Sequence, residues 1–240
     1  MEIAGRGAPA TGASSKWRAA GKRRLLSLSV AGCMWGAGAL LAAGGPAWAA
    51  YSGLTLIPTA DLLGPGQACL DYQVFGSFPM GRVHAAYVNT QFGVGNRAEL
   101  GLDFDLTEDA PAEASFNAKL LLRPLDRSPG VAVGIYNVAE HLRPSSYLAA
   151  TQGAGAARLH AGAIRTPEDE TQGLAGLDYS LSDRVQLCAD YVAGDGNGSA
   201  LGIAYQFSGR WGILIAWLRP NDREAEDSYT VDIGCVWPVQ

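Results

Sequence analysis

Charged residues, cysteines and helical periodicity are scarce in this 240-residue chain. Only 17% of its residues are charged, and its pI near 5.2 argues against a nucleic-acid-binding protein, because such proteins carry basic surfaces. Four cysteines are too few for a disulfide scaffold. A hydrophobic share of 48% excludes a disordered chain, and the 31 glycines without a three-residue repeat exclude collagen. What remains is a folded protein of soluble or membrane class.

Residues 1–49 differ in kind from the rest of the chain. They hold six basic residues and one acidic residue, then an apolar run from Leu25 to Gly44 and the ending Ala47-Trp48-Ala49. This order is typical of a secretory signal peptide cleaved after Ala49. Two alternatives stay open. The apolar run just reaches the ~20 residues of a membrane anchor helix, and Val30-Ala31-Gly32-Cys33 is similar to a lipoprotein processing site.

Removal of residues 1–49 leaves a strongly acidic chain. The 18 basic residues less six give 12, and the 23 acidic residues less one give 22, so the net charge is near -10. Lys119 is the only lysine left. Three cysteines remain, Cys69, Cys188 and Cys235, and an odd number in an exported chain allows at most one disulfide among them.

From residue 67 onwards, apolar and polar residues alternate. In residues 97–106, Leu100, Leu102 and Phe104 share one strand face, while Glu99 and Asp103 share the other. A period of two predicts β-strands, because successive strand side chains point to opposite faces. Counting in this way predicts twelve strands, at 67–77, 82–92, 97–106, 114–123, 130–138, 145–152, 157–165, 173–181, 184–193, 199–207, 211–218 and 228–237.

The connections between these strands alternate in length. The even-numbered ones are mostly short, as at 93–96 and 182–183, whereas 166–172 and 219–227 are longer and acidic. Short turns at one rim and long loops at the other are expected of an outer-membrane barrel. We therefore predict an all-β fold, a single antiparallel transmembrane β-barrel of about 12 strands, with short periplasmic turns and longer acidic outer loops. Residues 67–240 form the barrel, and residues 50–66 form a periplasmic segment or a plug.

Alternation alone does not tell which strand face lies outside. Three features favour a lipid-facing apolar surface with interfacial aromatic girdles. They are the export of the chain, the single lysine left after residues 1–49, and the aromatic residues near strand ends, such as Tyr72, Tyr191 and Trp217. A soluble periplasmic or secreted β-protein is the alternative.

The segment Tyr51-Ser52-Gly53-Leu54-Thr55-Leu56-Ile57-Pro58-Thr59-Ala60, followed by residues 67–75, resembles the opening of YjbH-like outer-membrane β-barrel proteins. Residues 92–104 and 178–194 resemble uncharacterised bacterial barrels of the same kind. The resemblance implies a role in exopolysaccharide production or export. This chain has room for only one barrel, and its ending Val236-Trp237-Pro238-Val239-Gln240 departs from the usual terminal aromatic residue.

The polar strand faces predict a set of residues lining the lumen: Asp71, Glu99, Asp103, Asp105, Lys119, Arg158, His160, Asp178, Asp190 and Asp232. Acids outnumber bases in this set, so an open lumen would prefer cations. The alternative is that these groups form a hydrogen-bonded network that fills a closed barrel.

We therefore expect an outer-membrane protein with a structural or passive-transport role, in its transport form a narrow cation-preferring channel. The alternatives are an accessory role in exopolysaccharide export and, less favoured, a lipid-modifying enzyme. We expect no enzyme activity and no cofactor or metal, since no nucleophile motif or zinc-like ligand spacing occurs. The expected partners are outer-membrane lipid, the barrel-assembly machinery and polysaccharide-export components, and no nucleic acid.

Overall fold

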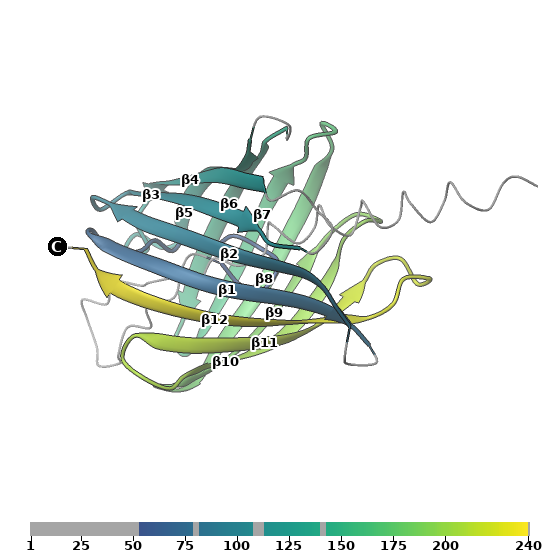
Figure 1. Cartoon of the computed structure of the whole chain (residues 1–240). Helices are drawn as coiled ribbons and strands as arrows, with labels where there is room; N and C mark the ends of the chain where they lie inside the picture. Colours follow the sequence, from purple (N-terminus) through teal and green to yellow (C-terminus); the bar gives the residue numbers. More distant parts are fainter. Residues whose placement is uncertain (1–52, 79–81, 108–112, 140–142, 240) are drawn as a thin grey trace, which may run out of the picture.

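The computed structural model describes residues 53–239 except 79–81, 108–112 and 140–142, so the predicted signal peptide lies outside the described residues. Twelve antiparallel strands form one closed barrel, in which β1 pairs with β12 (Figure 1). No helix in the described part of the chain is long and apolar enough to span a membrane. The strands are β1 (Gln67–Ser77), β2 (Arg82–Val94), β3 (Ala98–Asp105), β4 (Glu113–Arg123), β5 (Gly130–Val138), β6 (Ser145–Ala154), β7 (Ala157–Arg165), β8 (Thr171–Ser182), β9 (Val185–Val192), β10 (Gly198–Gln206), β11 (Trp211–Pro220) and β12 (Ser228–Pro238). The predicted fold class and strand number are confirmed.

The apolar face of the strands lies on the outside of the barrel. On β3, Leu100, Leu102 and Phe104 are exposed, whereas Glu99 and Asp103 on the other face of the strand are buried. The same alternation holds along β10, where Leu201, Ile203 and Tyr205 are exposed and alanines and a glycine are buried. The outer surface is therefore an apolar belt, while charged groups face inward. A soluble barrel would have the opposite arrangement.

The two rims of the barrel differ, as the loop lengths predict. One rim carries the connections 95–97, 124–129, 155–156, 183–184 and 207–210. Because neighbouring strands are antiparallel, β1 starts and β12 ends at this same rim. The Gly66 N–H donates to Gly93 O, and the Val239 N–H donates to Gly66 O. We call this the short-turn rim.

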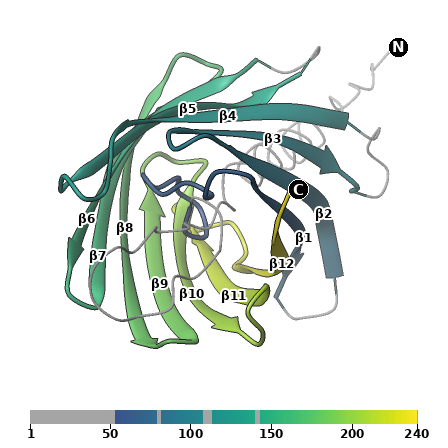
Figure 2. The ribbon, with the colours of Figure 1, turned by 90° about the vertical axis from the view of Figure 1, so that its left-hand side faces the viewer.

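Residues 53–66, which we call the inner segment, run from the short-turn rim into the barrel. Figure 2 shows the barrel from the side that carries the C-terminus, with the inner segment inside the ring of strands. At its far end the segment turns back on itself, since the Leu54 N–H donates to Ile57 O and Gly53 bridges Pro58. Every residue from Leu54 to Leu63 is buried.

The lumen also contains an apolar cluster. Leu54, Leu56 and Ile57 of the inner segment pack there with inward-facing residues of the wall. Phe75 and Tyr87 meet edge to face at 6.1 Å between ring centroids, and their contact forms part of this cluster. Inward-facing apolar residues at these positions exclude water from that part of the lumen. The barrel is therefore filled there, with the inner segment as part of the filling.

Candidate functional site

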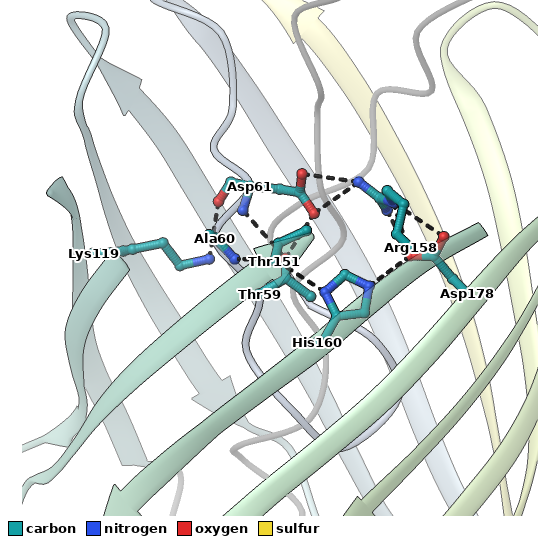
Figure 3. A network of polar contacts seen from close by, with 8 residues as sticks. All are labelled: Thr59, Ala60, Asp61, Lys119, Thr151, Arg158, His160 and Asp178. Atoms are coloured by element: carbon teal, nitrogen blue, oxygen red, sulfur yellow. Dashed lines mark hydrogen bonds and ion pairs between the residues drawn. The ribbon is translucent and has the colours of Figure 1, made fainter. Parts of the chain in front are cut away.

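The main polar site of the lumen joins Asp61 of the inner segment to the wall (Figure 3). Arg158 Nη1 donates to both carboxylate oxygens of Asp61, at 2.9 and 3.1 Å. On its other side, Arg158 Nε lies 3.0 Å from both oxygens of Asp178, which is its direct cross-strand partner on β8. One guanidinium thus bridges two carboxylates, which matches the fork of donors that arginine presents.

A second chain of contacts leads from the Asp178 carboxylate back to the inner segment. His160 Nε2 lies 2.9 Å from Asp178 Oδ2, and His160 Nδ1 lies 3.0 Å from Thr151 Oγ1. Thr151 Oγ1 accepts the Ala60 N–H at 2.9 Å. This arrangement fits a threonine hydroxyl that donates to Nδ1 and an Nε2–H that donates to Asp178. The inner segment is therefore linked to β6, β7 and β8 through one continuous network.

The pair formed by Lys119 and Glu99 contacts the inner segment from another part of the wall, on β3 and β4. Lys119 on β4 and Glu99 on β3 are direct cross-strand partners, and Nζ lies 3.7 Å from Oε2. Lys119 Nζ donates to the Asp61 carbonyl oxygen at 3.1 Å. Glu99 Oε1 accepts the Leu63 N–H at 2.8 Å. Both side chains are fully buried, so their charges compensate each other where water is absent.

Asp190 and Cys188 on β9 contact the turn of the inner segment. Asp190 Oδ2 accepts the Leu56 N–H at 2.8 Å. Cys188 Sγ lies 3.6 Å from Thr55 Oγ1. The three cysteines among the described residues are free thiols, so no disulfide joins the inner segment to this wall.

Further polar side chains lie on β1 to β4 and on β12. Asn89 Nδ2 donates to Asp71 at 2.9 Å. Asn117 donates to Asp103 at 2.8 Å and accepts from Gln91 at 2.9 Å. Asp232 is fully buried on β12, in register with Gln73 of β1. These groups give the lumen an acidic wall beside the inner segment.

The structure brings together five of the residues expected to line the lumen: Glu99, Lys119, Arg158, His160 and Asp178. Asp71, Asp103, Asp190 and Asp232 are also buried, but on other parts of the wall. Asp105 lies at the end of β3, where it is partly exposed and accepts the Thr107 N–H at 2.8 Å.

Sequence reasoning missed the contacts between the inner segment and the wall. Asp61 and Thr151 were not among the predicted site residues, nor were the apolar residues Leu54, Leu56 and Ile57. One signal pointed to them: an apolar segment with a single charged residue, Asp61, is too short to form a core of its own and needs a wall to pack against.

Acids dominate the charge of the lumen. The buried acids among the described residues are Asp61, Asp71, Glu99, Asp103, Asp178, Asp190 and Asp232. The bases close to them are Lys119, which is buried, and Arg158, whose side chain is 27% exposed. Within the ranges that the structure covers, no three His, Cys, Asp or Glu side chains come together as metal ligands. The described part of the lumen is therefore rich in hydrogen-bonding groups and holds more acidic than basic side chains.

No protein-family model and no curated protein matches the chain, so the YjbH-like resemblance stays a prediction. Several solved structures share its fold. The KdgM porin matches at a TM-score of 0.52 and 10% identity, over 70% of this chain and 98% of that one. KdgM in complex with disordered oligogalacturonate gives a TM-score of 0.53 at 10% identity, over 70% and 98%. The NanC porin gives 0.50 at 11% identity, again over 70% and 98%. At such identities the likeness shows the fold, a barrel of the porin type.

Proposed function

We propose that this chain is an outer-membrane passive-transport barrel that the inner segment closes. In this account the inner segment leaves its position in the lumen to open a path for small solutes. The ion pair between Asp61 and Arg158 is the contact that favours the closed state. That pair carries the proposal, because it joins the inner segment to a strand of the barrel wall.

A location in the outer membrane is supported by the surface of the barrel. Exposed leucines, isoleucines and aromatic residues cover the outer face, among them Leu102, Leu177 and Ile203. A closed sheet satisfies all its strand hydrogen bonds internally, which is a requirement for spanning lipid. An apolar outer belt is equally required, because lipid is the solvent there. Outer-membrane lipid is accordingly the proposed partner of this face, and the barrel-assembly machinery is the proposed means of insertion.

Closure by the inner segment is supported by where its contacts lie. Backbone groups of Leu56, Ala60 and Leu63 donate to three different strands, and Leu54 and Ile57 belong to the apolar cluster. The segment occupies space that a solute would have to cross. Its C-terminal end continues directly into β1.

A preference for cations is supported by the excess of buried acids. When the inner segment leaves, Asp61 leaves with it, but Asp71, Asp103, Asp190 and Asp232 stay on the wall. Their field raises the local concentration of cations and lowers that of anions in a narrow lumen. The predicted role in exopolysaccharide export rests on the YjbH-like resemblance alone and is the weaker proposal.

Conductance of two matched variants in planar bilayers tests the proposal. Asp61→Asn and Asp103→Asn each remove one buried carboxylate. Only Asp61 belongs to the polar network that joins the inner segment to the wall, whereas Asp103 contacts Asn117. We expect rare openings from the wild type, frequent openings from D61N, and wild-type behaviour from D103N. Heat-modified migration on gels checks that each variant is a folded barrel. Folded D61N that opens no more often than D103N would overturn the proposed closure.

A further inference from the structure

A groove of about 690 Å³ crosses the outer face of the barrel from β3 to β8. Its walls include the exposed side chains of Leu100, Leu120, Ile135 and Leu148. Most of the residues that line it are apolar. The groove is therefore a depression in the apolar belt that we propose to face lipid.

The groove lies where large and small side chains alternate across neighbouring strands. Leu100 of β3 is in register with Ala118 of β4, and Ala118 is in register with Ile135 of β5. In the adjacent row, Leu148 of β6 is in register with Ala163 of β7. Each alanine is smaller than its neighbours, so the surface is lower there than at the leucines and the isoleucine beside it.

The strand register also gives the direction of the groove. From Leu100, successive register partners are Ala118, Ile135, Ser146 and Arg165. Leu100 lies near the start of β3 at the short-turn rim, whereas Arg165 ends β7 at the opposite rim. Four spacings of about 4.8 Å between neighbouring strands make this row roughly 19 Å long. One leaflet, half of a hydrocarbon core of about 30 Å, is of similar depth, so the row is long enough for an acyl chain.

The end of the groove at Arg165 is polar. Ser146 of β6 and Thr171 of β8 are the register partners of Arg165 on its two sides. All three side chains are exposed, and all three line the groove. Hydroxyl and guanidinium groups both donate hydrogen bonds to phosphate oxygens. The row therefore passes from apolar side chains to phosphate donors, as a phospholipid passes from its acyl chains to its headgroup.

Arg165 also has a neighbour of opposite charge. Its Nε donates to Asp169 Oδ1 at 3.2 Å, and the two side chains are 64% and 79% exposed. Nη1 and Nη2 make no hydrogen bond within the described part of the chain, so both can donate to a phosphate. Glu168 and Glu170, which flank Asp169 in the loop, are exposed as well. This end of the groove thus combines one cation with several carboxylates.

A zwitterionic headgroup fits these charges better than an anionic one. Its phosphate pairs with Arg165, and its ammonium pairs with Asp169. A headgroup with two phosphates, or with one phosphate and no cation, brings uncompensated negative charge close to Glu168, Asp169 and Glu170, which repel it. The lipid that matches both the groove and its polar end carries one phosphate and one ammonium group.

We propose that this groove is a binding site for a phospholipid with an ethanolamine headgroup, whose acyl chain lies between Leu100 and Ile135 and whose phosphate binds Arg165. The site is on the outer face of the barrel. It is therefore separate from the proposed passage through the lumen and does not depend on it.

Native mass spectrometry of the purified barrel, released from detergent, tests this site. The probes are phosphatidylethanolamine and phosphatidylglycerol with the same acyl chains, and lipid A, each at the same concentration. We expect the wild type to retain one phosphatidylethanolamine in preference to the other two lipids. Arg165→Gln should lower this retention by roughly threefold or more, because an exposed charged contact is lost. Asp169→Asn should abolish the preference for phosphatidylethanolamine over phosphatidylglycerol, because it removes the carboxylate that pairs with the ammonium.

Two control variants match the two parts of the site. Arg219 is an exposed arginine near the end of β11 at the same rim, outside the groove, so Arg219→Gln should leave retention unchanged. Ala118→Phe fills the groove, whereas Ala175→Phe adds the same ring to an exposed outer position of β8 outside it. Only Ala118→Phe should lower retention. Heat-modified migration on gels checks that each variant is a folded barrel.

Three results would overturn the site. The first is equal retention of phosphatidylethanolamine by the wild type and R165Q, or an equal loss in R219Q. The second is equal retention by A118F and A175F, or a preference of the wild type for phosphatidylglycerol or lipid A. The third is a lipid-free dimer that A118F abolishes, which would show that a second copy of the chain covers the groove. Conductance enters none of these outcomes, so the transport proposal stands or fails separately.

Discussion

Arg158 Nη1 and Asp61 Oδ1 lie 2.9 Å apart, although 97 residues separate them in the chain. Arg158 belongs to the wall, and Asp61 is the only charged residue of the inner segment. Asp178 holds the opposite side of the same guanidinium. The pair is therefore the electrostatic connection between a fixed scaffold and the segment that fills it.

This pair should be coupled energetically as well as spatially. Arg158→Ala leaves Asp61 and Asp178 buried without their cation, and we expect the free energy of unfolding to fall by about 3 kcal/mol. In the double variant with Asp61→Ala, the loss should be smaller than the sum of the single losses by about 1 kcal/mol or more. Urea unfolding in lipid bilayers measures the free energy of unfolding of Arg158→Ala, of Asp61→Ala and of the double variant. Strictly additive losses would show that the two side chains act independently.

Ion selectivity of the open barrel should follow the wall carboxylates. In the D61N background, the reversal potential measured in a KCl gradient should have the sign that indicates a preference for K⁺ over Cl⁻. Adding Asp103→Asn should move this potential toward zero. Adding Asp169→Asn, which removes an exposed loop carboxylate paired with Arg165, should leave it unchanged, since exposed charges are screened by salt. Anion preference in the D61N background would contradict the acidic lumen.

Gly134 leaves space for a tyrosine ring. It is in register with Tyr147 on β6, and a Cβ at Gly134 would collide with that ring. Gly134→Ala should therefore destabilise the barrel by about 1–3 kcal/mol, as overpacking does. Gly153, where a Cβ would meet open space, is the control, and Gly153→Ala should change stability by less than about 0.5 kcal/mol. Equal effects of the two alanines in urea unfolding would refute the packing argument.

The depth of the apolar belt can be probed along a single strand. Leu177 lies in the middle of β8 and Leu181 near its end at the short-turn rim, and both are exposed on the outer face. In a bilayer, Leu177→Arg should destabilise folding by about 2–4 kcal/mol, whereas Leu181→Arg should do so by about 0–1 kcal/mol. The free energies of unfolding of Leu177→Arg and Leu181→Arg are compared in lipid vesicles. Equal effects at both depths would argue against a membrane-spanning barrel.

Ser77 and His84 lie in contact at the rim opposite the short-turn rim. Ser77 Oγ lies 3.3 Å from His84 Nδ1, in a contact that is exposed. We expect this pair to stabilise the β1–β2 hairpin and to have no hydrolytic role. The barrel should neither hydrolyse phospholipids nor react with a serine-directed fluorophosphonate. Labelling that disappears in Ser77→Ala would instead revive the lipid-modifying alternative.

The strands were predictable because both environments of a barrel are imposed on every strand. An apolar outer face and polar groups inside impose an alternation that can be read residue by residue, as in Leu100, Leu102 and Phe104 against Glu99 and Asp103. The cross-strand pair of Glu99 and Lys119 also follows from adjacency of consecutive strands. Contacts of this kind join strands that follow each other in the chain, so a sequence pattern is sufficient to suggest them.

The inner segment could not be placed in this way. Its residues have no period, since the segment runs through the lumen without joining the sheet. The contact of Asp61 with Arg158, and that of Leu56 with Asp190, exist only once twelve strands have closed around them. Phe75 and Tyr87 are apolar although they face the lumen, where the alternation pattern predicts polar residues. The inner segment explains this exception, because Phe75 and Tyr87 belong to the same apolar cluster as Leu54 and Ile57 of that segment.

A disulfide between the inner segment and the wall tests the central claim most directly. Thr55 Oγ1 lies 3.6 Å from the free thiol of Cys188, so Thr55→Cys in the D61N background places two thiols side by side. We predict frequent single-channel openings under reducing conditions and silence after oxidation, with D61N alone conducting under both. Unchanged openings after the disulfide has formed would contradict closure of the barrel by its inner segment.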